Sequence, residues 1–165
     1  MSQLCIFDTP EKAQAKHWQL NIDGASRNNP GPSGAGVVVS KEGQTVLKQG
    51  YYLGIKTNNQ AEYLSLLLGI FLAKQLMAAG DHLTIISDSE LMVKQLNGVY
   101  RVKNEELKRL FAVAKSLLDG VACRVKHVLR TENKHADEMA NVGVDTKHPV
   151  PEEFVALLAS HHLSW

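Results

Sequence analysis

The stretch T-N-N-Q-A-E-Y-L-S-L-L-L-G, residues 57–69, carries the clearest structural signal in the chain. Thr57 followed three residues later by Gln60 is a capping-box pattern, which predicts a helix that starts there. The helix is expected to continue until Gly80 stops it. Apolar residues occupy most of its circumference, which is typical of a helix buried against a sheet. Glu62 lies in its first turns, and a carboxylate beside a core needs a partner because an unpaired buried charge is costly.

Three segments before this helix have the pattern of strands. Residues 17–23 (H-W-Q-L-N-I-D) alternate apolar and polar side chains, and a turn-rich segment follows. Residues 34–40 (G-A-G-V-V-V-S) and 44–53 (Q-T-V-L-K-Q-G-Y-Y-L) are β-branched and aromatic runs separated by a short turn. These two runs predict a hairpin.

Strands and helices alternate after the long helix. In chain order we expect a strand over 82–87, a short helix ending at Gly98, a helix capped by Asn104, a strand over 121–130 and a helix from Asn133 to Val144. An antiparallel start that feeds into strand–helix–strand crossovers predicts an α/β fold, with a mixed sheet and helices on its faces.

Length and composition indicate a soluble globular protein with one main domain. The chain has 165 residues, of which 44% are hydrophobic and 21% charged, and its net charge is +1. That balance neither supports nor excludes a nucleic-acid partner. We expect a domain over 17–145, an N-terminal extension over 1–16 and a C-terminal tail over 146–165 that packs on the domain.

No targeting or membrane segment is expected. The start M-S-Q-L-C-I-F-D lacks a charged leader, and the most apolar run, residues 64–73, is far shorter than the roughly 20 residues of a membrane helix. Cys5 and Cys123 fit no metal or redox spacing, so two free thiols are the simpler expectation, although a disulfide is not ruled out by sequence. We therefore predict a cytoplasmic, monomeric protein that does not contact membranes.

Four acidic residues fall at element boundaries. Asp23 ends the first strand, Asp88 follows the fourth, and Glu62 and Asp137 lie in the first turns of two helices. The carboxyl ends of strands in an α/β sheet are where site residues gather. Carboxylates gathered there would require cations such as Mg²⁺ or Mn²⁺, and two such ions about 4 Å apart can promote phosphodiester hydrolysis. Taken singly, each acid is better interpreted as a solvated surface charge or as a helix N-terminal acid favoured by the helix dipole, so spacing alone does not bring the four together.

Four segments in this order resemble ribonuclease H of type 1. They are I-D-G-A-S-R-N-N-P-G-P-S-G-A-G, T-N-N-Q-A-E-Y, S-D-S-E-L and H-A-D-E-M-A-N, and the resemblance covers about residues 18–145. It implies the ribonuclease H-like fold, a five-stranded mixed sheet in the order 3-2-1-4-5 with helices on both faces. It also implies an endonuclease that hydrolyses the RNA strand of RNA–DNA hybrids and leaves 5′-phosphate and 3′-hydroxyl ends.

The resemblance assigns catalytic roles by position. Asp23, Glu62, Asp88 and Asp137 match the acids that bind two Mg²⁺ or Mn²⁺ ions. By this match Asp23 bridges both ions. Glu62 and Asp88 hold the ion on the leaving-group side, and Asp137 holds the ion that activates water.

The resemblance also assigns substrate-binding residues. Ser26 and Asn29, together with Asn58 and Asn59, match positions that approach the minor groove, where 2′-hydroxyls identify RNA. Thr57 and Asn104 match a pocket for a phosphate of the DNA strand, and both are also expected to cap helices.

The sequence departs from the family near its last acid. Many members carry a histidine in a loop there, whereas the connection V-L-R-T-E-N-K-H-A-D is short and resembles the subset with V-x-R-x-x-N-x-x-A-D. His127 is expected on the apolar face of its strand, in the core. Either His135 or Arg130 could replace the loop histidine, and the sequence does not decide between them or neither.

Two further departures concern the substrate surface. The segment V-Y-R-V-K-N is too brief for the Lys-rich, Trp-bearing protrusion of some members, which leaves Tyr100, Arg101 and Lys103 as a reduced version. Glu90 stands where some members have a substrate-reading glutamine, and we interpret it as a helix N-terminal acid.

Two alternative functions are weighed. A catalytically idle nucleic-acid-binding module of the same superfamily would be marked by a lost carboxylate, and all four are present. A two-metal nuclease acting on DNA or single-stranded RNA is disfavoured by the T-N-N and N-N-P-G segments, which match residues that read the hybrid.

Overall fold

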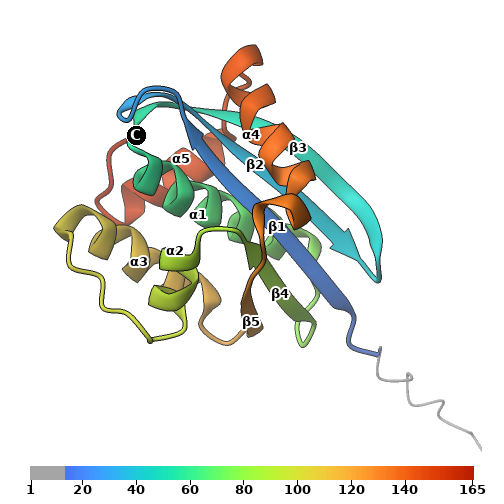
Figure 1. The fold of residues 1–165 in the computed structure, drawn as a ribbon. Helices are drawn as coiled ribbons and strands as arrows, with labels where there is room; N and C mark the ends of the chain where they lie inside the picture. The colour runs from blue at the N-terminus through green and yellow to red at the C-terminus, as the bar shows by residue number, and fades with distance from the viewer. Residues whose placement is uncertain (1–13) are drawn as a thin grey trace, which may run out of the picture.

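Five strands form one mixed sheet in the order β3-β2-β1-β4-β5 in the computed structural model, which describes residues 14–165 (Figure 1). β1 pairs antiparallel with β2 and β2 with β3, whereas β4 pairs in parallel with both β1 and β5. The predicted order and the predicted hairpin are confirmed. The strands are β1 (His17–Ser26), β2 (Gly31–Lys41), β3 (Gln44–Lys56), β4 (His82–Ser87) and β5 (Ala122–His127).

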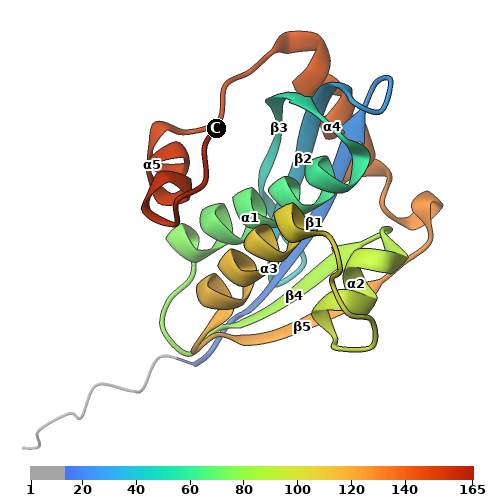
Figure 2. The same cartoon turned by 90° about the vertical axis from the view of Figure 1, so that its left-hand side faces the viewer.

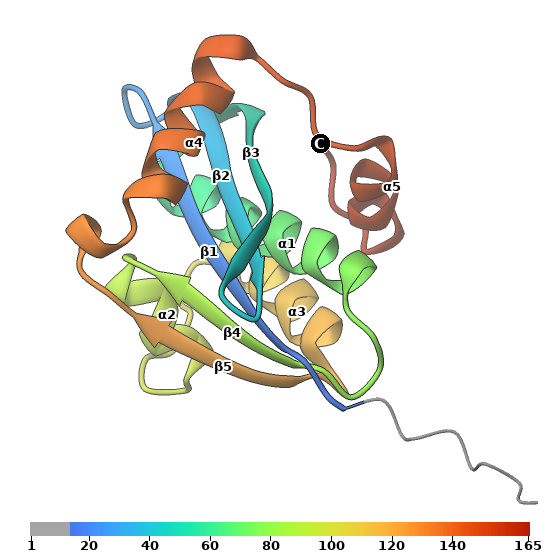
Figure 3. The ribbon, with the colours of Figure 1, turned by 90° about the vertical axis from the view of Figure 1, so that its right-hand side faces the viewer.

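Helices cover both faces of this sheet, as predicted (Figures 2 and 3). α1 crosses one face with α3 beside it, and α4 lies on the opposite face over β1, β2 and β3. The helices are α1 (Asn58–Leu76), α2 (Glu90–Leu96), α3 (Glu105–Leu118), α4 (Lys134–Thr146) and α5 (Glu152–Ser160), with a 3₁₀ turn over Arg130–Glu132.

The central helix α1 begins as the sequence predicts. The Thr57 hydroxyl accepts a hydrogen bond from the Gln60 N–H at 3.2 Å, and the Gln60 side chain accepts one from the Thr57 N–H at 2.8 Å. Both halves of the capping box are therefore present. The helix ends at Leu76, a few residues earlier than expected, and Gly80 takes a φ of +88° in the turn beyond it.

The C-terminal tail packs on the body through α5. Phe154 and Leu158 are fully buried, and the Phe154 ring lies 5.7 Å from that of Phe71 on α1. The expectation that this tail docks on the domain is confirmed. Of the predicted N-terminal extension, residues 1–13 lie outside the described part of the chain, and so does Cys5; Cys123 carries a free thiol.

Helix α4 rests on the sheet backbone through glycines, a feature we call the glycine contact (Gly34, Gly36, Gly50 and Gly143). A Cβ atom added to Gly36 would lie 1.8 Å from the Ala136 carbonyl oxygen on α4. Added Cβ atoms at Gly34 and Gly50 would each lie 2.1 Å from a helix carbonyl oxygen, and one at Gly143 would lie 2.4 Å from a strand carbonyl oxygen. Only residues without a side chain permit this approach of helix and sheet.

The buried carboxylate of Asp81 links the start of β1 to the turn before β4, at the opposite end of the sheet from the four acids. Asp81 accepts hydrogen bonds from the Trp18 indole N–H at 2.8 Å and from the N–H groups of Lys16 at 2.9 Å and Ala78 at 3.0 Å. These donors, the backbone ones first, hold the pKa of Asp81 below its usual range. The carboxylate therefore stays charged and paired.

The prediction of a core histidine is wrong. His127 is exposed, because β5 is an edge strand whose end is left in solvent. Leu129, two residues further along, lies after the strand and is 66% exposed. Within residues 14–165, no helix has the length and apolar composition needed to cross a membrane.

Candidate active site

Three of the four predicted acids converge at one edge of the sheet. Asp23 lies on β1, Asp88 directly follows β4, and Glu62 is in the second turn of α1. Each offers a carboxylate oxygen, and these oxygens all lie within 4.8 Å of one another. β1 and β4 are adjacent and parallel, so their carboxyl ends bring Asp23 and Asp88 to the same place.

A glycine brings the third acid to the other two. A Cβ at Gly24 would lie 2.4 Å from the Ala61 carbonyl carbon, so the start of α1 approaches β1 only because residue 24 has no side chain. The Gly24 N–H then donates a hydrogen bond to Glu62 Oε2 at 3.2 Å. The carboxylate that the sequence places beside the core thus faces two other carboxylates.

Few groups of the protein offset the negative charge of these three acids. Burial, followed by the charges of Glu62 and Asp88, raises the pKa of Asp23 to about 9. Burial and the charge of Asp88 also raise the pKa of Glu62, partly offset by the Gly24 hydrogen bond and by Arg130. Three close oxygen donors of this kind fit a hard divalent cation, whose charge would remove the repulsion.

The fourth acid, Asp137, lies near the other three and forms an ion pair with Arg130. Asp137 is in the first turn of α4, and its Oδ1 lies 3.2 Å from Arg130 Nη2. It lines the cleft together with the three converging acids, although it is not one of the three mutually close donors. The sequence flagged Arg130 as a candidate for this region, but the ion pair was not predicted.

Asn133 joins the start of α4 to the strand that carries Asp23. Its side-chain N–H donates to the Ile22 carbonyl oxygen at 2.9 Å, and its Oδ1 accepts from the Asn21 side chain at 3.1 Å. Asn133 is 2% exposed. Its side chain makes no cap hydrogen bond to α4, so this residue ties helix to strand; the sequence indicated only the helix start.

The predicted substrate residues fall into two neighbouring clefts. The first, the acid cleft, is an open space of about 1150 Å³ that holds all four acids. Ser26, Asn58 and Asn59 also line it, as predicted residues for approaching a minor groove. The Ser26 hydroxyl donates to the Lys56 carbonyl oxygen at 2.8 Å, which fixes the loop after β1 against the end of β3.

The second, the cap cleft, is an open space of about 820 Å³ at the starts of α1 and α3. The two N-cap residues Thr57 and Asn104 line it with Asn29, Asn58 and Asn59. The Asn104 Oδ1 accepts from the Leu107 N–H at 3.0 Å, so both residues cap their helices as expected. Two helix N-termini that meet at one cleft offer free N–H groups and partial positive charge to an anion.

The structure shows where the residues lie at which the sequence departs from the family pattern. His135 Nδ1 lies 3.3 Å from Lys48 Nζ on β3, and His135 does not line the acid cleft, whereas Arg130 does. Glu90 is in the first turn of α2 and pairs with Lys94 at 2.7 Å, in keeping with a helix N-terminal acid. The Lys94 ammonium lies 4.9 Å from the Tyr100 ring centre.

Known proteins resemble the chain over most of its length. A family model described as reverse transcriptase-like matches residues 21–143. A ribonuclease HI from Halobacterium salinarum is 39% identical over 126 residues, which are 75% of this chain and 62% of that protein. A ribonuclease H from Ruegeria pomeroyi is 32% identical over 146 residues, which cover 77% of this chain and 92% of that protein. The chain thus spans less than two-thirds of the Halobacterium relative.

The fold also matches solved structures. The LC11 ribonuclease H1, solved in complex with an RNA/DNA hybrid, superposes with a TM-score of 0.75 at 34% identity. The match covers 78% of this chain and 97% of that protein.

Proposed function

Because the chain belongs to the type 1 ribonuclease H family, we propose that it hydrolyses the RNA strand of RNA–DNA hybrids. The observation that carries the proposal is the convergence of Asp23, Glu62 and Asp88 within 4.8 Å, with Asp137 in the same cleft. An idle binding module would have no use for a buried cluster whose repulsion destabilises the free protein.

We propose that two divalent cations, Mg²⁺ or Mn²⁺, complete the site. When bound, such ions supply a nucleophile from water at neutral pH and stabilise the charge that develops during in-line displacement at a phosphate. Asp23 lies within reach of both Glu62 and Asp88 and would be shared between ions, as the resemblance implies. Asp137 would complete the set from α4, with Arg130 beside it to contact a substrate phosphate. Hydrolysis would leave 5′-phosphate and 3′-hydroxyl ends.

Residues that line the acid cleft and the cap cleft would select the substrate. Ser26, Asn58 and Asn59 stand beside the acids with short side chains that can exchange hydrogen bonds with 2′-hydroxyls. The cap cleft at Thr57 and Asn104 is suited to a phosphate of the strand that is not cut. Because Asn58 and Asn59 line both clefts, one duplex could occupy the two together.

The test is cleavage of an end-labelled RNA–DNA hybrid in Mg²⁺, in Mn²⁺ and in EDTA. Single-stranded RNA, double-stranded RNA and a DNA duplex serve as substrate controls, and Asp23→Asn serves as the protein control. We expect metal-dependent cleavage of the hybrid alone, lost in the variant. Hybrid binding without cleavage in either metal would instead establish a binding module, and cleavage of the DNA duplex would establish a different nuclease.

A further inference from the structure

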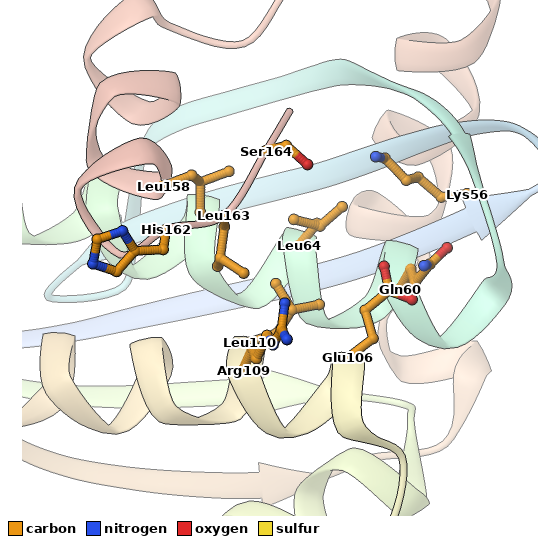
Figure 4. Close-up of a pocket in the computed structure, with 10 residues that line it drawn as sticks. All are labelled: Lys56, Gln60, Leu64, Glu106, Arg109, Leu110, Leu158, His162, Leu163 and Ser164. Atoms are coloured by element: carbon orange, nitrogen blue, oxygen red, sulfur yellow. The ribbon is translucent and has the colours of Figure 1, made fainter.

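A third hollow lies next to the cap cleft, between α1, α3 and the segment that follows α5 (Figure 4). We call it the tail hollow; it is an open space of about 550 Å³. Leucines form its floor, and Lys56, Gln60, Glu106, Arg109 and His162 stand around it. The proposed hydrolysis requires none of the residues that line only this hollow.

The three hollows are neighbours along the start of α1. The acid cleft and the cap cleft share Asn58 and Asn59. The cap cleft and the tail hollow share Gln60 and Glu106. A strand that extends from the acid cleft into the cap cleft therefore has the tail hollow next to it.

The charges of the tail hollow suit a phosphodiester. Lys56 and Arg109 form no ion pair with any residue that the structure describes, so both cations are available to a phosphate. Glu106 is the one carboxylate of the lining, and it stands at the border with the cap cleft. The balance of fixed charge within the hollow is therefore positive.

An aromatic ring stands beside these cations. Trp165, next to the lining residue Ser164, is 43% exposed, and its ring centre lies 5.6 Å from Lys56 Nζ. Its inner edge is fixed by the buried Phe154 ring, at 6.0 Å in a T-shaped contact. Proteins that bind single-stranded nucleic acids place aromatic side chains beside cations, and the bases stack on those rings. The half-exposed indole of Trp165 is suited to this role.

We propose that the tail hollow binds the uncut strand of the hybrid where it continues beyond the cap cleft. Lys56 and Arg109 would contact its backbone, and Trp165 would stack on an unpaired base. The assignment rests on the proposed function, because the cut strand occupies the acids and leaves the second strand to the neighbouring clefts. The predicted substrate is a hybrid whose DNA strand extends past the duplex.

The test measures affinity for hybrids of one duplex length, either blunt or with a single-stranded extension on the DNA or on the RNA strand, at either end. An Asp23→Asn background prevents cleavage. We expect a DNA extension at one end to raise the affinity roughly tenfold over that of the blunt hybrid. Trp165→Ala should remove this gain and leave the affinity for the blunt hybrid unchanged. Arg109→Gln should lower the dependence of log Kd on log salt by about 1 for that extended hybrid only.

Lys115→Gln on the same helix α3 is the matched control, because it removes an equal charge outside the hollow. Fluorescence gives a second readout: the difference between the protein and its Trp165→Phe form isolates Trp165, since Trp18 is 4% exposed. Quenching of that difference signal by the DNA-extended hybrid supports the proposal. It is overturned if extensions do not tighten binding, if only RNA extensions do, or if the variants weaken blunt and extended hybrids alike. A protein that cleaves hybrids but shows any of these results keeps the proposed function and loses only this inference.

Discussion

Gly36→Ala is expected to damage both stability and catalysis, because it places a methyl group inside the glycine contact. The added Cβ would lie 1.8 Å from the Ala136 carbonyl oxygen and 2.7 Å from the Ala140 nitrogen. Both neighbours are backbone atoms and no rotamer change relieves the clash. To restore even a tight contact of 3.0 Å, α4 must retreat from the sheet by about 1.2 Å.

Two consequences follow from that retreat. Overpacking of this kind costs about 1–3 kcal/mol in the free energy of unfolding. Asp137 lies one residue after Ala136 and moves with α4, and a displacement of about 1 Å at a catalytic group lowers the rate roughly a hundredfold. Thermal unfolding followed by circular dichroism measures the first effect, and kcat for hybrid cleavage well below the melting temperature measures the second.

Gly43→Ala provides the matched control. Gly43 is in the β2–β3 turn with a φ of +80°, and a Cβ there would meet nothing within 4 Å. The substitution forces alanine into the left-handed region at a cost of roughly 1–2 kcal/mol, but it leaves α4 in place. Stability should therefore fall in both variants and kcat only in Gly36→Ala. Wild-type kcat in Gly36→Ala, or an equal loss in Gly43→Ala, would refute the reasoning.

Four further outcomes are expected. In EDTA the folded state holds a proton on Asp23 that the unfolded state releases, so above about pH 5, where ordinary carboxylates have finished titrating, the melting temperature should fall as the pH rises toward about 9, and Mg²⁺ should reverse the fall. Asp23→Asn should then stabilise the metal-free protein by about 0.5–2 kcal/mol near neutral pH, measured by urea unfolding; a destabilised variant would contradict this. Arg130→Gln should lower kcat/KM for the hybrid about tenfold through a lost phosphate contact; unchanged kinetics would exclude the role. Asp81→Asn should lower the melting temperature and leave kcat unchanged, because the amide turns a donor toward Trp18 or its neighbours, far from the acids; a kcat loss would show coupling between the two ends of the sheet.

Local signals in the sequence predicted much of the fold. The capping box at Thr57 and the N-cap at Asn104 depend on side chains that bond to their own helix, so short windows of sequence reveal them. Asp88 directly follows β4, as the sequence predicted, whereas Asp23 was expected to end the first strand and lies inside β1, which continues to Ser26. Their convergence, by contrast, depends on the parallel pairing of β1 with β4, which only the family resemblance indicated in advance.

What the sequence did not show depends on contacts between distant elements. His127 fits an alternating apolar pattern, yet β5 is an edge strand and its end is left in solvent. The pair of Arg130 with Asp137 and the link from Asn133 to Ile22 join residues whose spacing carries no local signature. The glycine contact is equally hidden, because a glycine in a strand gives no indication of which helix will lie against it.

The place of α5 in the core has a consequence for biosynthesis. Phe71 on α1 lies against Phe154 on α5. Phe154 stands more than eighty positions later in the chain, so this contact and the full burial of Phe154 form only after α5 has folded back onto α1. While the ribosome is still making that segment, Asp23, Glu62 and Asp88 are already synthesised, but the part of α1 around Phe71 lacks the cover that α5 provides. A nascent chain in this state presents an apolar helix surface to its surroundings, as incomplete folding intermediates do. Emergence of α5 from the ribosome, rather than completion of the sheet, is therefore the stage at which this surface of α1 is covered.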